Sequence, residues 1–97
     1  MRRSIFALTL IASSALAQND VPACVHVEAI ARWGAMAYNH VVHVTNGCDR
    51  PVRCQVSTNV NPQVQEITVQ PRGSADVTTY IGSPAREFTP RVHCTLQ

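Results

Sequence analysis

The sequence has 97 residues, of which 45% are hydrophobic, with eight basic side chains, six acidic side chains and four cysteines. A chain this short forms one domain at most. Its charge balance excludes a polybasic nucleic-acid binder, an acidic disordered tail and a two-domain enzyme. A domain of this size buries a small core and generally needs cross-links to be stable.

The N-terminus has the pattern of a secretory signal peptide. Arg2 and Arg3 form a positive n-region, and residues 5–12 form an apolar h-region. Residues 15–17, Ala-Leu-Ala, place small side chains at the two positions that signal peptidase reads, which predicts cleavage before Gln18. The apolar run is shorter than the about 20 residues that span a bilayer.

We therefore expect a signal peptide over residues 1–17 and one exported domain over residues 18–97, without a membrane span. Cleavage removes two of the eight arginines, so six arginines then face six acids and the formal charge falls from +2 to zero. The basic charge of the whole chain thus says little about partners, and no nucleic acid is expected. A short signal and the absence of lysine favour a secreted or periplasmic protein of a bacterium.

Six short segments of alternating hydrophobicity, rich in β-branched residues, predict strands after residue 22. The predicted strands are Cys24–Ile30, Met36–Thr45, Val52–Thr58, Val64–Val69, Ala75–Ile81 and Phe88–Leu96. The first of them could instead form a two-turn helix over residues 25–31. The breaks contain turn residues, including Trp33-Gly34 and Asn46-Gly47, and Asn-Gly is the strongest turn signal because both residues tolerate positive φ.

The alternation places apolar side chains on one face of each strand and polar ones on the other. Val52, Cys54 and Val56 share a face, while Val92 and Cys94 share a face of the last strand. One buried and one solvated face per strand is typical of packed antiparallel sheets. The sequence thus predicts an all-β fold, a small antiparallel β-sandwich that is immunoglobulin-like in outline.

Four cysteines in a short exported chain predict two disulfides. Cys54 and Cys94 both lie on apolar strand faces, which favours a buried bridge between them and leaves Cys24 to pair with Cys48. The alternative joins Cys48 to Cys54 and Cys24 to Cys94. Redox and metal roles are disfavoured because the chain has no C-x-x-C motif and lacks the spacing of thiolate metal sites.

Histidine is the candidate metal ligand, because neutral imidazole binds copper and zinc. The four histidines are His26, His40, His43 and His93. In a regular strand His40 and His43 point to opposite faces, so a joint site would need a β-bulge. Scattered histidines without a metal are the more economical interpretation, and we expect no cofactor.

Catalysis is not expected in this chain. No G-x-S-x-G elbow and no H-E-x-x-H motif is present in the sequence. A domain of about 80 residues also offers little room for a pocket that excludes water.

Two groups of residues are candidates for a binding surface. Arg53 and Arg91 form a cationic stripe if their strands are neighbours, although nearby acids would neutralise it. Trp33 and Tyr38 lie near one predicted turn and could anchor a partner, or Trp33 could simply cap the core.

These observations predict an exported, non-enzymatic binding or structural module with an unidentified protein or surface ligand as its partner. Two alternatives remain open at this point. One is a copper-binding protein that uses the histidines, and the other is a small secreted inhibitor or effector that inserts a loop into its target.

Overall fold

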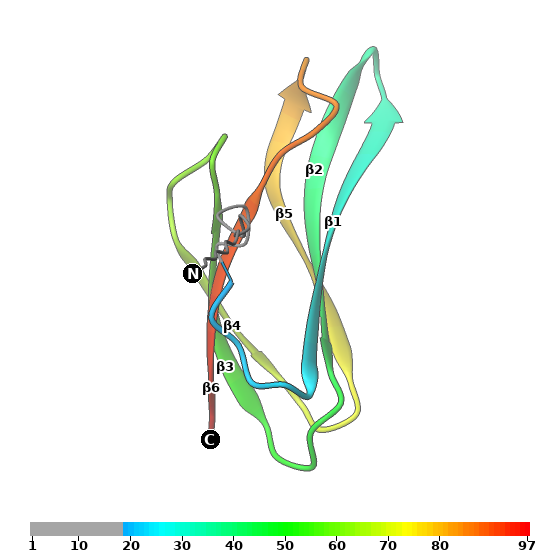
Figure 1. Ribbon diagram of the computed structural model, residues 1–97. Coiled ribbons are helices and arrows are strands. Elements are labelled where there is room, and N and C mark those ends of the chain that lie inside the picture. Colours follow the sequence, from blue (N-terminus) through cyan, green and yellow to red (C-terminus); the bar gives the residue numbers. More distant parts are fainter. Residues whose placement is uncertain (1–18) are drawn as a thin grey trace, which may run out of the picture.

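The computed structural model describes residues 19–97, and the predicted signal peptide lies outside the described residues. The described chain forms six strands (Figure 1). They are β1 (Val25–Gly34), β2 (Ala37–Asn46), β3 (Val52–Thr58), β4 (Gln65–Val69), β5 (Ser74–Ser83) and β6 (Pro90–Leu96). Each overlaps one predicted strand, and β3 has the predicted bounds. The helix considered for residues 25–31 does not form, because every residue of β1 pairs with a residue of β2.

The strands form two three-stranded antiparallel sheets with the orders β1-β2-β5 and β4-β3-β6. Figure 1 shows the two sheets as separate layers that converge near one end of the molecule. None of residues 19–97 lies in a helix long and apolar enough to cross a membrane.

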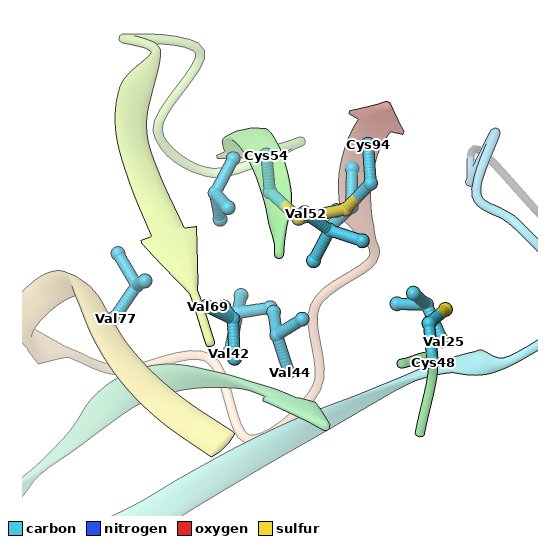
Figure 2. Packing of buried hydrophobic residues seen from close by; sticks show 11 residues of the cluster. Val25, Val42, Val44, Cys48, Val52, Cys54, Val69, Val77 and Cys94 are labelled. Carbon is cyan, nitrogen blue, oxygen red and sulfur yellow. A yellow bond between two sulfur atoms is a disulfide. The ribbon is translucent and has the colours of Figure 1, made fainter. Parts of the chain in front are cut away.

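Valine side chains fill the space between the sheets (Figure 2). The buried valines of the core are Val25, Val42, Val44, Val52, Val56, Val69, Val77 and Val92. They follow the predicted alternation, since β3 is buried at Val52, Cys54 and Val56 and exposed at Arg53 and Gln55. Each fully buried valine contributes about 1.5 kcal/mol or more, so period-two patterning both forms and stabilises the sandwich.

The cysteines form two disulfides, Cys24–Cys48 and Cys54–Cys94. Cys54 and Cys94 lie directly opposite each other on β3 and β6, with their sulfur atoms toward the core (Figure 2). Cys24 precedes β1 and Cys48 follows β2, so the other bridge closes the base of the β1–β2 hairpin. This is the pairing that the buried strand faces favour.

The structure differs from the prediction at two turns. Trp33 lies within β1, and the chain reverses after Gly34, at Ala35 and Met36. Asn46 ends β2, but neither Asn46 nor Gly47 has positive φ, so the expected reason for an Asn-Gly turn was wrong.

The two residues of the Asn-Gly pair are needed for different reasons. The Asn46 side chain donates to the carbonyl oxygens of Arg50, Val69 and Gln70 and accepts the Cys48 N–H. A Cβ at Gly47 would lie 2.9 Å from the Cys24 carbonyl oxygen, closer than real Cβ atoms approach.

The last strand begins later than predicted, at Pro90 rather than Phe88. Residues 84–89 form a loop, because the Phe88 ring leaves the sheet and stacks on the imidazole of His40 at a centroid distance of 4.2 Å. Aromatic packing here overrides the local strand propensity.

Candidate functional site

The β1–β2 hairpin ends in a two-residue turn with an unusual backbone. Gly34 pairs with Ala37, and the intervening Ala35 and Met36 have φ of 52° and 67°. Positive φ at both central residues matches the hairpin twist but normally requires Asn or Gly. A side chain at such a position costs about 1 to 3 kcal/mol, and strain of this kind concentrates at functional sites.

Large apolar side chains lie exposed at this end of the hairpin. Trp33 is 64% exposed and Met36 is 86% exposed. Trp33 pairs with Tyr38 across the two strands, and the rings meet edge to face at a centroid distance of 4.9 Å. Figure 1 shows this end of the hairpin extending past the connection between β3 and β4. We call the surface made by Arg32, Trp33, Met36 and Tyr38 the hairpin end.

The sequence pointed to Trp33 and Tyr38 as possible anchors, and the structure makes them cross-strand neighbours. Met36 was missed as a site residue because no residue signal marks a strained Ala-Met turn. Arg32 was not predicted as a site residue, because its position depends on how β1 lies against β2 and β5. Only the register of β1 with β2 places all four side chains at one end.

A charged cluster lies on the outer face of the same sheet. The Asp76 carboxylate on β5 accepts a hydrogen bond from His43 Nδ1 on β2, and its other oxygen lies 3.5 Å from the Arg32 guanidinium on β1. The hydrogen bond from His43 and the positive charges of His43 and Arg32 lower the pKa of Asp76. The cluster therefore links Arg32 of the hairpin end to both other strands of the sheet.

We expect acid to weaken this cluster. Because the pKa of Asp76 is lower in the folded protein than in the unfolded chain, ionised Asp76 contributes stability above about pH 4 that is lost as pH falls through the folded pKa. Urea denaturation at a series of pH values measures the effect. An Asp76→Asn variant should show a shallower fall of the unfolding free energy in acid.

The control for this experiment is Asp49→Asn, because Asp49 is exposed and forms no ion pair among residues 19–97. Equal acid sensitivity of the parent protein and Asp76→Asn would contradict the expectation.

The histidines do not converge on one site. His40 is buried and stacked on Phe88, whereas His43 bonds Asp76 on the outer face of its sheet. His93 lies in the other sheet, 2.9 Å from Asp20, and His26 is exposed on β1. Within residues 19–97 no three His, Cys, Asp or Glu side chains are arranged to hold a metal ion. The predicted metal site therefore lacks geometric support in the described chain.

The predicted arginine pair is split along its sheet. β3 and β6 are neighbours, but Arg53 lies opposite Thr95 and Arg91 lies opposite Ser57. Arg53 Nε also lies 3.9 Å from a Glu66 oxygen. A binding role for Arg53 and Arg91 stays a prediction.

Comparison with known proteins shows the family to which the chain belongs. A model of the family described as alpha amylase inhibitor matches residues 20–94, which include β1 to β5, all of β6 but its last two residues, and all four cysteines. The chain belongs to the alpha amylase inhibitor family. No curated protein and no solved structure matches the chain.

Membership of this family has three consequences. A family of inhibitors agrees with the prediction that the chain is not an enzyme. The family and the two disulfides together indicate an extracellular protein whose partner is another protein. The small two-sheet β domain agrees with the predicted all-β class, while its likeness to immunoglobulin domains stays a prediction.

Proposed function

We propose that this protein inhibits an α-amylase by binding the enzyme through the hairpin end. The observation that carries the proposal is the exposure of Met36 on a turn with a strained backbone and of Trp33 on the strand that leads into it. Family membership supports the class of target. We also propose that residues 1–17 direct export and that residues 18–97 act outside the cytoplasm, as secreted or periplasmic bacterial protein.

The composition of the hairpin end suits a protein interface. Tryptophan, tyrosine and arginine are enriched among residues that dominate binding energy, and methionine is enriched at interfaces. An aromatic side chain buries 150–250 Å² when it is covered, on the order of several kcal/mol. Exposed Trp33 and Met36 therefore hold apolar area that only a partner would remove from water.

The hairpin end is also held in place before it binds. The Cys24–Cys48 bridge closes the base of the hairpin, β5 pairs along β2, and the Trp33–Tyr38 contact joins the two strands near the turn. A surface that is already ordered loses little conformational entropy on binding, which favours tight inhibition.

Arg32 supplies charge that suits this class of target. Glycoside hydrolases such as α-amylases carry a pair of catalytic carboxylic acids. The Arg32 guanidinium is more than half exposed, and a guanidinium can bind a carboxylate through two hydrogen bonds. We therefore expect Arg32 to face the acidic part of the enzyme's cleft.

Amylase inhibition tests the proposal directly. Hydrolysis of a chromogenic maltooligosaccharide by a bacterial and an animal α-amylase should be inhibited by the oxidised protein. Trp33→Ala should raise the inhibition constant about 100-fold, as expected for a central aromatic anchor. Met36→Gly should weaken inhibition while stabilising the fold by about 1 kcal/mol, because glycine relieves the positive φ.

The control is Leu96→Ala, which changes another exposed apolar side chain at the end of β6. It should leave the inhibition constant unchanged. Full inhibition by Trp33→Ala would contradict the assignment of the hairpin end. A parent protein that inhibits neither amylase would contradict the proposed function.

A further inference from the structure

The loop between β5 and β6, residues 84–89, carries an exposed arginine. The chain leaves β5 at the end of the molecule where the hairpin turn lies, bends, and returns as β6 (Figure 1). Arg86 and Glu87 are exposed in this loop, and Arg86 forms no ion pair within residues 19–97. The loop has no positive-φ residue, and none of its residues belongs to a strand.

The backbone of Ala85, the residue before Arg86, is hydrogen-bonded to the interior of the protein. The Ala85 N–H donates to the Oγ of buried Ser83 at 2.9 Å. The Ala85 carbonyl accepts from His40 Nε2 at 2.7 Å, and because a carbonyl only accepts, Nε2 carries the proton. Both polar backbone groups of Ala85 therefore bond inside the protein.

The residues after Arg86 are fixed as well. The Phe88 ring stacks on His40 with an interplanar angle of 14°. Thr89 exchanges two hydrogen bonds with Asn59, from its N–H to Asn59 Oδ1 and from the Asn59 N–H to its carbonyl. Arg86 thus lies between two anchored segments, and His40 holds both of them.

This arrangement leaves Arg86 at the surface. The chain bends at Arg86, and because Ala85 before it and Phe88 after it make contacts inside the protein, the bend carries the Arg86 side chain into solvent. Endopeptidases of trypsin specificity bind an arginine side chain in a pocket with a carboxylate at its base. A loop that is already ordered binds at little entropic cost.

The other arginines of the described chain lack this combination. Arg32 and Arg53 lie near acids, Arg50 bonds the Gln97 carbonyl, Arg72 has a φ of 62°, and Arg91 lies within the ladder of β6.

We propose that this loop is a second inhibitory site, directed at serine endopeptidases that cleave after arginine. Arg86 fills the specificity pocket, and the Arg86–Glu87 peptide bond lies at the catalytic serine. Hydrolysis adds one water across that bond, giving a carboxylate on Arg86 and an ammonium group on Glu87. The anchors at Ala85, Phe88 and Thr89 keep the two new ends together, so reformation of the bond competes with release.

Trypsin and a chromogenic arginine amide substrate provide the test. The oxidised protein should inhibit competitively, and Arg86→Ala should raise the inhibition constant at least about 100-fold. Arg86→Lys should remain within about tenfold of the parent, because lysine also reaches the pocket carboxylate. Arg91→Ala is the matched control and should leave the inhibition constant unchanged. Circular dichroism verifies that each variant is folded.

Mass spectrometry separates inhibition from simple digestion. Asn59→Ala removes one anchor at an exposed position and should speed cleavage after Arg86. Absence of trypsin inhibition, equal inhibition by Arg86→Ala, or rapid cleavage of the parent protein after Arg86 would each overturn the proposal. The same holds if Arg86→Ala weakens only amylase inhibition, since the loop would then belong to the amylase surface. Failure of amylase inhibition alone would leave this site standing.

Discussion

Replacement of Asn46 by alanine should lower the free energy of unfolding by about 4 kcal/mol, a large part of the stability of so small a domain. Asn46 is fully buried and lies where β2 ends. Its amide joins the turn before β3 to the end of β4 through Arg50 and Val69. Removing it takes the side-chain partner from the buried Cys48 N–H and from the Val69 carbonyl, and each buried group left unsatisfied costs about 1 to 3 kcal/mol.

Equilibrium denaturation in urea, followed by far-ultraviolet circular dichroism, measures this loss. Asn46→Asp should be nearly as damaging, because a carboxylate keeps the bond from Cys48 but faces three carbonyl oxygens. Asn59→Ala, which removes a single bond at an exposed site, should cost about 1 kcal/mol or less. A loss below about 1 kcal/mol for Asn46→Ala would show that water replaces the amide.

Replacing both Cys54 and Cys94 by alanine should lower the free energy of unfolding by at least about 4 kcal/mol. The bridge closes 40 residues of chain, and the loop-entropy model assigns about 4 kcal/mol to a loop of that length. Both cysteines are buried in the core, so their removal also leaves space between the sheets (Figure 2). For a domain this small, a loss of that size lowers Tm by more than about 15 °C.

Thermal denaturation of the two double variants tests the order of the effects. Replacing both Cys24 and Cys48 should cost less, about 3.5 kcal/mol, because that bridge closes only 24 residues. Loss of this bridge should also loosen the base of the β1–β2 hairpin. At a temperature below both unfolding transitions, the variant without Cys24 and Cys48 should therefore inhibit amylase less well than the variant without Cys54 and Cys94. A smaller Tm loss for the Cys54–Cys94 variant than for the Cys24–Cys48 variant would contradict the loop argument.

The scaffold explains why the hairpin end can tolerate strain. Asn46 and the Cys24–Cys48 bridge fix the base of the hairpin, while pairing with β5 supports β2 along its length. Stability gained at the base and in the valine core offsets the unfavourable φ values of Ala35 and Met36. Asn-Gly, the pair that this type of turn prefers, would fold with less strain but would remove the Met36 side chain from the proposed interface.

The parts of the fold that could be predicted depend on local pattern. Alternation of valine with polar residues located β3 with its bounds and the approximate position of every other strand, because the side-chain period of a strand is two. The same pattern placed Cys54 and Cys94 on buried faces and so favoured their pairing. The end of β6 nearest Phe88 was misplaced because a stacking partner 48 residues away, His40, takes that ring out of the sheet.

By itself the sequence determined the all-β class, the number of strands, the buried faces and two disulfides, since each depends on residue type and spacing along the chain. Only the tertiary structure decided where the first hairpin turns, which charges meet on Asp76 and which loop His40 holds. Those features depend on register between strands that are distant in sequence, and a shift of one residue would move each side chain to the opposite face. The binding surfaces proposed at the hairpin end and at Arg86 belong to this second group.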